Sequence, residues 1–176
     1  REMGKPIAQS RQEVEKCART LEFYAKEAAT YLADMPVETD ARNSFVSFRP
    51  LGVVLAVMPW NFPYWQVFRA MAPALMAGNT MVLKHASNVS GCAMAIEQVL
   101  KAAGVPRGLF QTLLVPSSRV AALIEAPEIA AVTFTGSTEA GRKVAETAAR
   151  NLKKQVLELG GSDPYIILED ADMDLA

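Results

Sequence analysis

From Leu51 onward, short apolar runs alternate with segments of helical period, and this alternation constrains the fold more than any other feature of the chain. The apolar runs predict strands at 53–57, 80–83, 110–115, 131–135 and 155–159, with a further one at 164–168. The segments between them predict helices at 67–77, 89–103, 119–125 and 139–152. Strands joined through helices pair in parallel, so we expect an α/β fold: a parallel sheet with helices on both faces.

The residues before this alternation predict a long helix and a short strand. Residues 10–33 carry an apolar stripe at helical spacing, formed by Val14, Cys17, Ala18, Leu21, Tyr24, Ala25, Ala28 and Leu32. Met35-Pro36 ends this helix, and residues 44–49 alternate like a strand. We therefore expect residues 1–34 to form an N-terminal helix and residues 44–176 to form the βαβ units.

Composition excludes several classes of function. Lys plus Arg number 18 against 19 Asp plus Glu, so no excess of positive charge favours binding to nucleic acid or an acidic membrane surface. No apolar run reaches the roughly 18–20 residues of a membrane span. Two cysteines and one histidine make no zinc set, so no metal is expected, and they favour a reducing, cytoplasmic compartment. A chain that starts at Arg1 and stops within helical sequence is expected to be a piece of a longer protein.

Polar motifs follow the predicted strands, where a parallel sheet binds its ligands. Pro59-Trp60-Asn61-Phe62-Pro63 follows the first strand, and the Asn61 amide can donate a hydrogen bond to a developing oxyanion. The alternative is that Asn61 only stabilises the turn. Glu158 stands between two leucines and before Gly160-Gly161; partial burial there would raise its pKa and make it a general base. Its alternative is pairing with a cation or facing solvent.

Two further motifs suit a nucleotide. Lys84 ends the second strand, with Ser87 one turn on, and no acid beside them repels a 2′-phosphate. A solvated lysine is the alternative. Residues 135–141 (TGSTEAG) join a strand to a helix, so that Gly136 permits a tight turn and the amides of the helix N-terminus suit a phosphate. An ordinary helix cap would use the same residues.

Together and in this order, the four motifs closely resemble the NAD(P)-dependent aldehyde dehydrogenase superfamily over essentially the whole chain. The resemblance implies an incomplete, Rossmann-like cofactor-binding domain of an enzyme that oxidises an aldehyde to a carboxylic acid with NADP or NAD, in a homodimer or homotetramer. The nucleophilic Cys of the family lies downstream of the glutamate motif, whereas Cys17 and Cys92 precede Glu158. We therefore expect the catalytic domain to lie outside this chain, and the chain alone to be inactive.

The resemblance also implies individual roles. Asn61 would donate to the oxyanion and Glu158 would be the general base; the cofactor would contact Trp60, Asn61, Lys84, Ser87, Gly136, Ser137 and Leu159. Lys84 and Ser87 would hold the adenosine ribose, and the missing acid beside Ser87 suggests that NADP is accepted. His85 is assigned no role.

Arg69 suggests the substrate. Phe62, Gln66 and Arg69 fall on neighbouring helical turns, along what the family uses as its aldehyde channel. An unpaired guanidinium there would suit a carboxylate at the far end of the substrate, so we expect an ω-carboxy aldehyde, and the run at 160–164 resembles the succinate-semialdehyde dehydrogenase branch. Alternatively, Arg69 reaches solvent or pairs with an acid. A betaine-aldehyde or broad-range aldehyde dehydrogenase, or a non-catalytic nucleotide-binding module, are the other functions considered.

Overall fold

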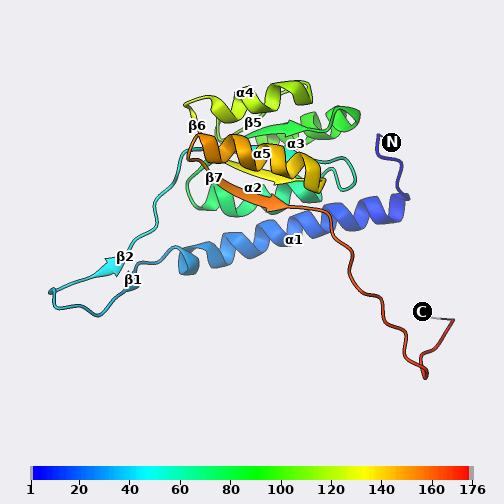
Figure 1. Ribbon diagram of the computed structural model, residues 1–176, viewed down its shortest axis with the longest axis horizontal. Helices are drawn as coiled ribbons and strands as arrows, with labels where there is room; N and C mark the ends of the chain where they lie inside the picture. Colours follow the sequence, from blue (N-terminus) through cyan, green and yellow to red (C-terminus); the bar gives the residue numbers. More distant parts are fainter. Residues whose placement is uncertain (1, 175–176) are drawn as a thin grey trace.

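Five parallel strands form one sheet in the computed structural model, which describes residues 2–174 (Figure 1). Their order is β5-β4-β3-β6-β7, with bounds β3 (Val53–Met58), β4 (Thr80–His85), β5 (Phe110–Thr112), β6 (Ile129–Thr135) and β7 (Lys154–Glu158). All neighbouring pairs are parallel. The predicted α/β class is confirmed, and the five predicted strands from 53 to 159 are present with shifted ends.

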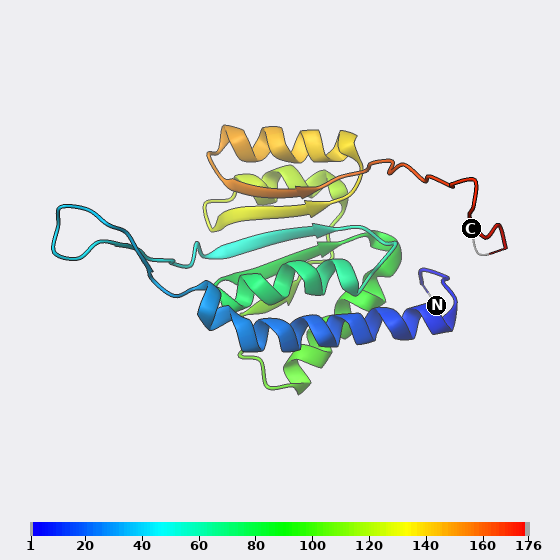
Figure 2. The ribbon, with the colours of Figure 1, turned by 90° about the horizontal axis from the view of Figure 1, so that it is seen from below.

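Helices cover both faces of this sheet (Figure 2). One face packs against α2 (Trp65–Met76) and α3 (Ser90–Ala102), with α1 (Ile7–Tyr31) lying along α2 on the outside. The other face packs against α4 (Val120–Glu125) and α5 (Thr138–Arg150). Successive residues of a strand point to opposite faces, so Ala56 joins the core under α2 and α3 while Leu55 and Val57 join the core under α4 and α5.

The order in which strands are added to the sheet changes direction at β3. The chain runs from β3 to β4 and β5 on one side, and then returns to place β6 and β7 on the other side. Val57 lies opposite both Lys84 and Phe134 near the carboxyl ends of the three central strands. Ligands of parallel sheets usually bind in the crevice where the strand order changes direction. We therefore expect a ligand site at the carboxyl ends of β3, β4 and β6.

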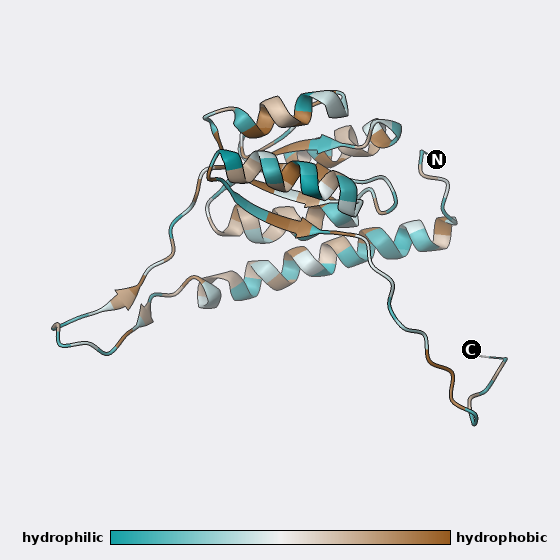
Figure 3. Ribbon diagram, in the orientation of Figure 1, coloured by the Kyte–Doolittle hydropathy of each residue, from teal (hydrophilic) through white to brown (hydrophobic). Residues whose placement is uncertain are grey.

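Two predicted strands differ from the structure: one is absent and the other is shorter than expected. Residues 164–168 form no strand, because the chain leaves the sheet after Glu158, and the side chains from Tyr165 to Leu168 are exposed. The extended C-terminal segment of the ribbon includes a hydrophobic stretch (Figure 3). The strand predicted at 44–49 shrinks to β2 (Phe45–Val46), which pairs with β1 (Met35–Pro36) in an antiparallel hairpin that was not predicted. Apolar alternation alone cannot say whether a neighbouring strand exists.

The apolar stripe predicted on α1 is also only partly right. Cys17 and Ala28 are buried as expected, but Val14 is 52% exposed and its neighbour Glu13 is buried. The carboxylate of Glu13 accepts hydrogen bonds at the start of α2, so the face of α1 that is turned toward α2 includes this acid as well as apolar residues. No helix within residues 2–174 is long and apolar enough to cross a membrane.

Candidate functional site

Two clefts adjoin at the carboxyl ends of the central strands. The larger has a volume of about 660 Å³ and the second about 540 Å³, which are ordinary sizes for small-molecule sites. Pro59, Thr135 and Gly136 line both of them. Two ligands, or two parts of one reaction, can therefore meet across a boundary only a few residues wide.

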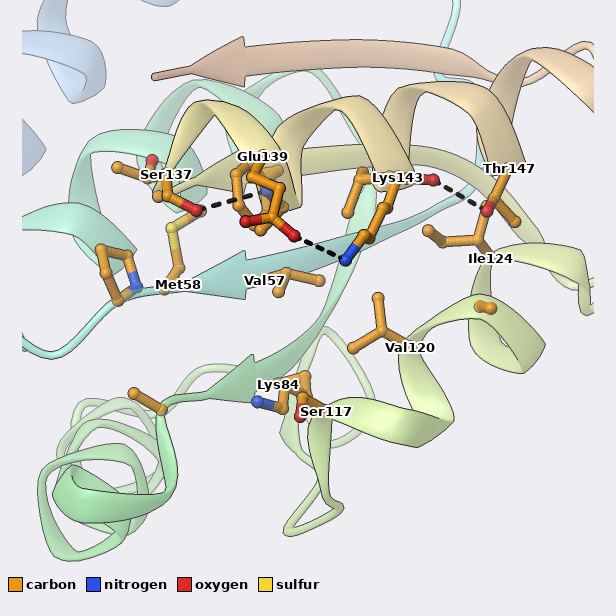
Figure 4. Close-up of a pocket in the computed structure, with 18 of the residues that line it drawn as sticks. Val57, Met58, Lys84, Ser117, Val120, Ile124, Ser137, Glu139, Lys143 and Thr147 are labelled. Carbon is orange, nitrogen blue, oxygen red and sulfur yellow. Dashed lines mark hydrogen bonds and ion pairs between the residues drawn. The ribbon is translucent and has the colours of Figure 1, made fainter. Parts of the chain in front are cut away.

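The larger cleft lies between the strand ends and the helices α4 and α5. Lys84 and Ser117 lie on one side of it, and Ser137, Glu139 and Lys143 lie on the other (Figure 4). Ser137 caps α5, since its Oγ accepts a hydrogen bond from the N–H of Ala140 at 3.3 Å. The first turn of a helix leaves backbone N–H groups without intrahelical partners, so the start of α5 presents donors to the cleft.

Lys84 is the most informative group in this cleft. Its side chain is buried at 7% exposure, and desolvation lowers its pKa. Glu139 and Lys143 pair with each other at 2.8 Å, and no carboxylate within residues 2–174 forms an ion pair with Lys84. A buried cation that faces a cleft without a counter-ion is well suited to an anionic ligand.

Gly136 and Gly141 permit the close packing around the start of α5. A Cβ added to Gly136 would lie 2.6 Å from Cζ of Phe134. A Cβ on Gly141 would overlap the Leu159 side chain, so the absence of a side chain lets α5 rest directly on the residue after Glu158. The N–H of Gly136 also donates to the Glu158 carbonyl at 3.0 Å. These contacts fix the end of β7 against the start of α5.

The second cleft collects most of the predicted catalytic and substrate residues. Its lining includes Trp60, Asn61, Gln66, Arg69, Glu158 and Leu159, which come from the turn after β3, from α2 and from the end of β7. Asn61 is exposed, so its amide is available to a ligand. Phe62 is not part of this lining; the Lys5 ammonium lies 3.9 Å from the centre of its ring. The structure therefore brings Gln66 and Arg69 of α2 together in this cleft, whereas Phe62 precedes α2 and lies outside the lining.

Arg69 does not stand unpaired. Its Nη1 donates to Oε1 of Glu158 at 2.8 Å, and its Nη2 donates to Oγ1 of Thr135 at 3.1 Å. The Arg69 side chain is 29% exposed and that of Glu158 is 51% exposed. Arg69 is therefore neither buried nor unpaired, and Glu158 is exposed. The structure shows the alternative considered for both residues, an ion pair between a cation and an acid.

His85 positions the turn that carries Asn61, a role that the sequence did not reveal. Its Nδ1 lies 2.9 Å from the Ala86 nitrogen and 3.3 Å from the Met58 carbonyl oxygen, and its Nε2 lies 2.8 Å from the Pro63 carbonyl oxygen. The two shorter contacts are satisfied together when Nε2 carries the proton and donates to Pro63 while Nδ1 accepts from the N–H of Ala86. The ring is buried, and desolvation lowers its pKa, which favours the neutral form that this pattern requires. The only signal in the sequence was a single histidine directly after Lys84 at the end of a predicted strand.

Two N-terminal acids hold the starts of α2 and α3, and the sequence did not reveal them either. Oε1 of Glu13 accepts from the N–H groups of Tyr64 and Trp65 at 2.8 and 2.9 Å, and its Oε2 pairs with Lys5. The Glu2 carboxylate accepts from the N–H groups of Gly91 and Cys92, each at 2.8 Å. Carboxylates are favourable at helix N-termini, so Glu13 stabilises the start of α2 and Glu2 stabilises the start of α3.

The remaining predicted residues lie outside the two clefts. Ser87 begins the 3₁₀ helix η1 (Ser87–Val89) and is exposed, but it does not line the larger cleft, whereas Lys84 and Ala86 do. Cys17 is buried in α1, and desolvation raises its pKa to about 12. Burial also raises the pKa of Cys92 on α3. Neither cysteine is placed or activated as a nucleophile.

Known proteins resemble the chain in both sequence and structure. The model of the aldehyde dehydrogenase family matches residues 1–176. A probable succinate-semialdehyde dehydrogenase [NADP(+)] of Synechocystis is 58% identical over 175 residues, covering 99% of this chain and 38% of that protein. A succinate-semialdehyde dehydrogenase [NADP(+)] of Mycobacterium avium is 51% identical over 178 residues, with 99% and 38% covered.

Solved structures agree. The succinic semialdehyde dehydrogenase of Streptococcus pyogenes, crystallised with NADP+ as the cofactor, superposes with a TM-score of 0.93 at 42% identity, covering 98% of this chain and 38% of that one. The chain thus spans 38% of the length of the relatives described here. With the family model matched from end to end and the sheet, turn and glutamate motifs all in place, the chain belongs to the aldehyde dehydrogenase family.

Proposed function

We propose that this chain is the cofactor-binding part of an enzyme that oxidises an ω-carboxy aldehyde, succinate semialdehyde, to the dicarboxylic acid with NADP+. One observation carries the proposal: a cleft suited to an anion adjoins a cleft that holds Asn61, Glu158 and Arg69. The similar proteins of Synechocystis, Mycobacterium avium and Streptococcus pyogenes, whose names specify this aldehyde and NADP+, support it.

The larger cleft fits a phosphorylated dinucleotide. Lys84 would bind a phosphate or ribose oxygen, because its buried ammonium faces the cleft without a carboxylate partner among the described residues. Gly136 and Ser137 would receive the pyrophosphate at the start of α5. When bound, the cofactor supplies a nicotinamide ring that accepts hydride. Ser87 lies outside the lining of this cleft, next to Ala86 which lines it, so its contact with the ribose stays a prediction.

The second cleft would hold the aldehyde. The Asn61 amide would donate to the carbonyl oxygen as negative charge develops on it. Glu158, next to Leu159 at the boundary with the larger cleft, would take the proton of the attacking thiol or water. Arg69 would bind the carboxylate of the substrate, at the other end of the molecule from the aldehyde.

The thiol itself is not one of the two cysteines of this chain, since neither lies in a cleft. We propose that the full-length protein supplies it from outside these 176 residues. In the complete reaction, aldehyde and water become carboxylic acid, a hydride goes to the nicotinamide, and a proton leaves through Glu158 to solvent.

The test is turnover by the protein expressed from its complete reading frame. Production of NADPH with succinate semialdehyde, at a kcat/KM well above that for betaine aldehyde or a neutral aldehyde, is the expected result. The 176-residue chain alone is expected to bind NADP+ without turnover. Equal efficiency on charged and neutral aldehydes would contradict the substrate, and NADP+ binding without turnover by the full protein would favour a non-catalytic nucleotide-binding module.

A further inference from the structure

The Arg69–Glu158 ion pair joins two groups that the proposed reaction needs separately. Arg69 lies on α2 and Glu158 at the end of β7, and the pair spans the second cleft at an Nη1···Oε1 distance of 2.8 Å. While this pair persists, Oε1 of Glu158 and Nη1 of Arg69 are occupied by each other. Neither group is then fully available to a substrate.

The pair is easily exchanged. The Glu158 side chain is 51% exposed and that of Arg69 is 29% exposed, so water reaches both partners and screens their attraction. Thr135 holds the second nitrogen of the guanidinium at 3.1 Å, and this bond does not involve Glu158. Arg69 can therefore remain in position while one carboxylate replaces another on its Nη1.

We propose that the carboxylate of the substrate takes the place of Glu158 on Arg69, and that this exchange releases Glu158 to act as the base. The idea rests on the proposed function, because it assumes an ω-carboxy aldehyde in this cleft. The released carboxylate accepts the proton of the attacking thiol or water and passes it to solvent. Arg69 therefore determines specificity in two ways. It binds the carboxylate of the substrate, and it stays paired with Glu158 when an aldehyde without a carboxylate enters the cleft, so that the base is not released.

The test divides the substrate into two pieces. Succinate semialdehyde cut at its central C–C bond corresponds to acetaldehyde and acetate, so acetate can supply the missing carboxylate to the full-length enzyme while acetaldehyde is turned over. Acetate is expected to raise kcat for acetaldehyde severalfold in the wild type, with chloride at equal ionic strength as the control. In Arg69→Met, kcat for acetaldehyde is expected to be raised already and to be insensitive to acetate.

A matched control is Arg107→Met, which removes an exposed arginine outside both clefts and is expected to behave as the wild type. If Arg69→Met only raises KM for succinate semialdehyde, with kcat for acetaldehyde unchanged and no acetate effect in the wild type, release of Glu158 is refuted while the proposed function stands. If succinate semialdehyde is not oxidised at all, the proposed function fails, and the acetate response still decides whether a carboxylate releases Glu158.

Discussion

Replacing Glu13 by alanine is expected to destabilise the start of α2 by about 3 kcal/mol. Its Oε1 accepts two backbone hydrogen bonds, from Tyr64 and Trp65, and the residue is only 5% exposed. A hydrogen bond to a charged group contributes about 1.5–3 kcal/mol net, so two such bonds give about 3–6 kcal/mol. Water that enters the vacated space rehydrates part of the two N–H groups, which favours the lower end of this range.

Hydrogen–deuterium exchange of the amides of Tyr64 and Trp65 in the full-length protein measures this effect locally. A loss of about 3 kcal/mol corresponds to roughly 100-fold faster exchange, since about 1.4 kcal/mol is a factor of ten. Glu13→Gln keeps an oxygen acceptor but loses the charge that opposes Lys5, so an intermediate rate is expected. Glu15→Ala, on the exposed side of the same helix, is the matched control and should leave the rate unchanged.

The reasoning is refuted if these two amides exchange no faster in Glu13→Ala than in Glu15→Ala. If Glu13→Gln exchanges as fast as Glu13→Ala, the charge of the carboxylate matters more than its acceptor geometry. The first result would leave α1 with a purely hydrophobic attachment through residues such as Cys17, whereas the second would keep Glu13 and assign its effect to charge.

Three other residues give sharp expectations. Burial holds the pKa of His85 below its ordinary value of 6.5, so the unfolded chain takes up this proton at a higher pH than the folded chain, and stability falls as the pH drops below about 6.5. His85→Gln should flatten that part of a plot of denaturation midpoint against pH; an unchanged slope would contradict this. Lys84→Met removes a desolvated ammonium, so thermal melts should show a more stable cofactor-free protein, while titration shows NADP+ affinity reduced by about 10- to 100-fold. Loss of stability with unchanged affinity would argue against the anion role of Lys84. Leu152 is 95% exposed with φ of 53°, in the left-handed region at the end of α5, so Leu152→Gly should gain about 1 kcal/mol and raise Tm by about 2–4 °C; a lower Tm would contradict the strain.

The fold was predictable where a segment's own pattern determines its structure. Apolar runs such as Val53–Met58 are buried on both faces of a parallel sheet, and the helices between them carry stripes of helical period, so local periodicity is enough. The β1–β2 hairpin and the exposed segment at 164–168 were missed because pairing depends on a neighbour that periodicity cannot identify.

The site was predictable in its membership more than in its contacts. Lys84 and Glu158 lie at the carboxyl ends of their strands and Asn61 lies just after β3, and a parallel sheet brings such residues to one edge. The pairing of Arg69 with Glu158 links positions 89 residues apart, and the contact of Glu13 with Trp65 links positions 52 apart. Such contacts depend on the rotation of each helix about its axis relative to the neighbouring helix or strand. The pattern of apolar residues predicts this rotation only roughly.

The central position of β3 also has a consequence for how the protein is made. Among the sheet strands β3 is the first to be synthesised, yet it needs a partner on each side, and β6 begins roughly 70 residues after β3 ends. At about 5–20 residues per second, that delay lasts roughly 4–14 s. During translation, the β6-facing edge of this apolar, β-branched strand therefore stays unpaired, because β4 pairs with the opposite edge and α2 covers only one face, and this edge is open to other nascent chains until β6 arrives.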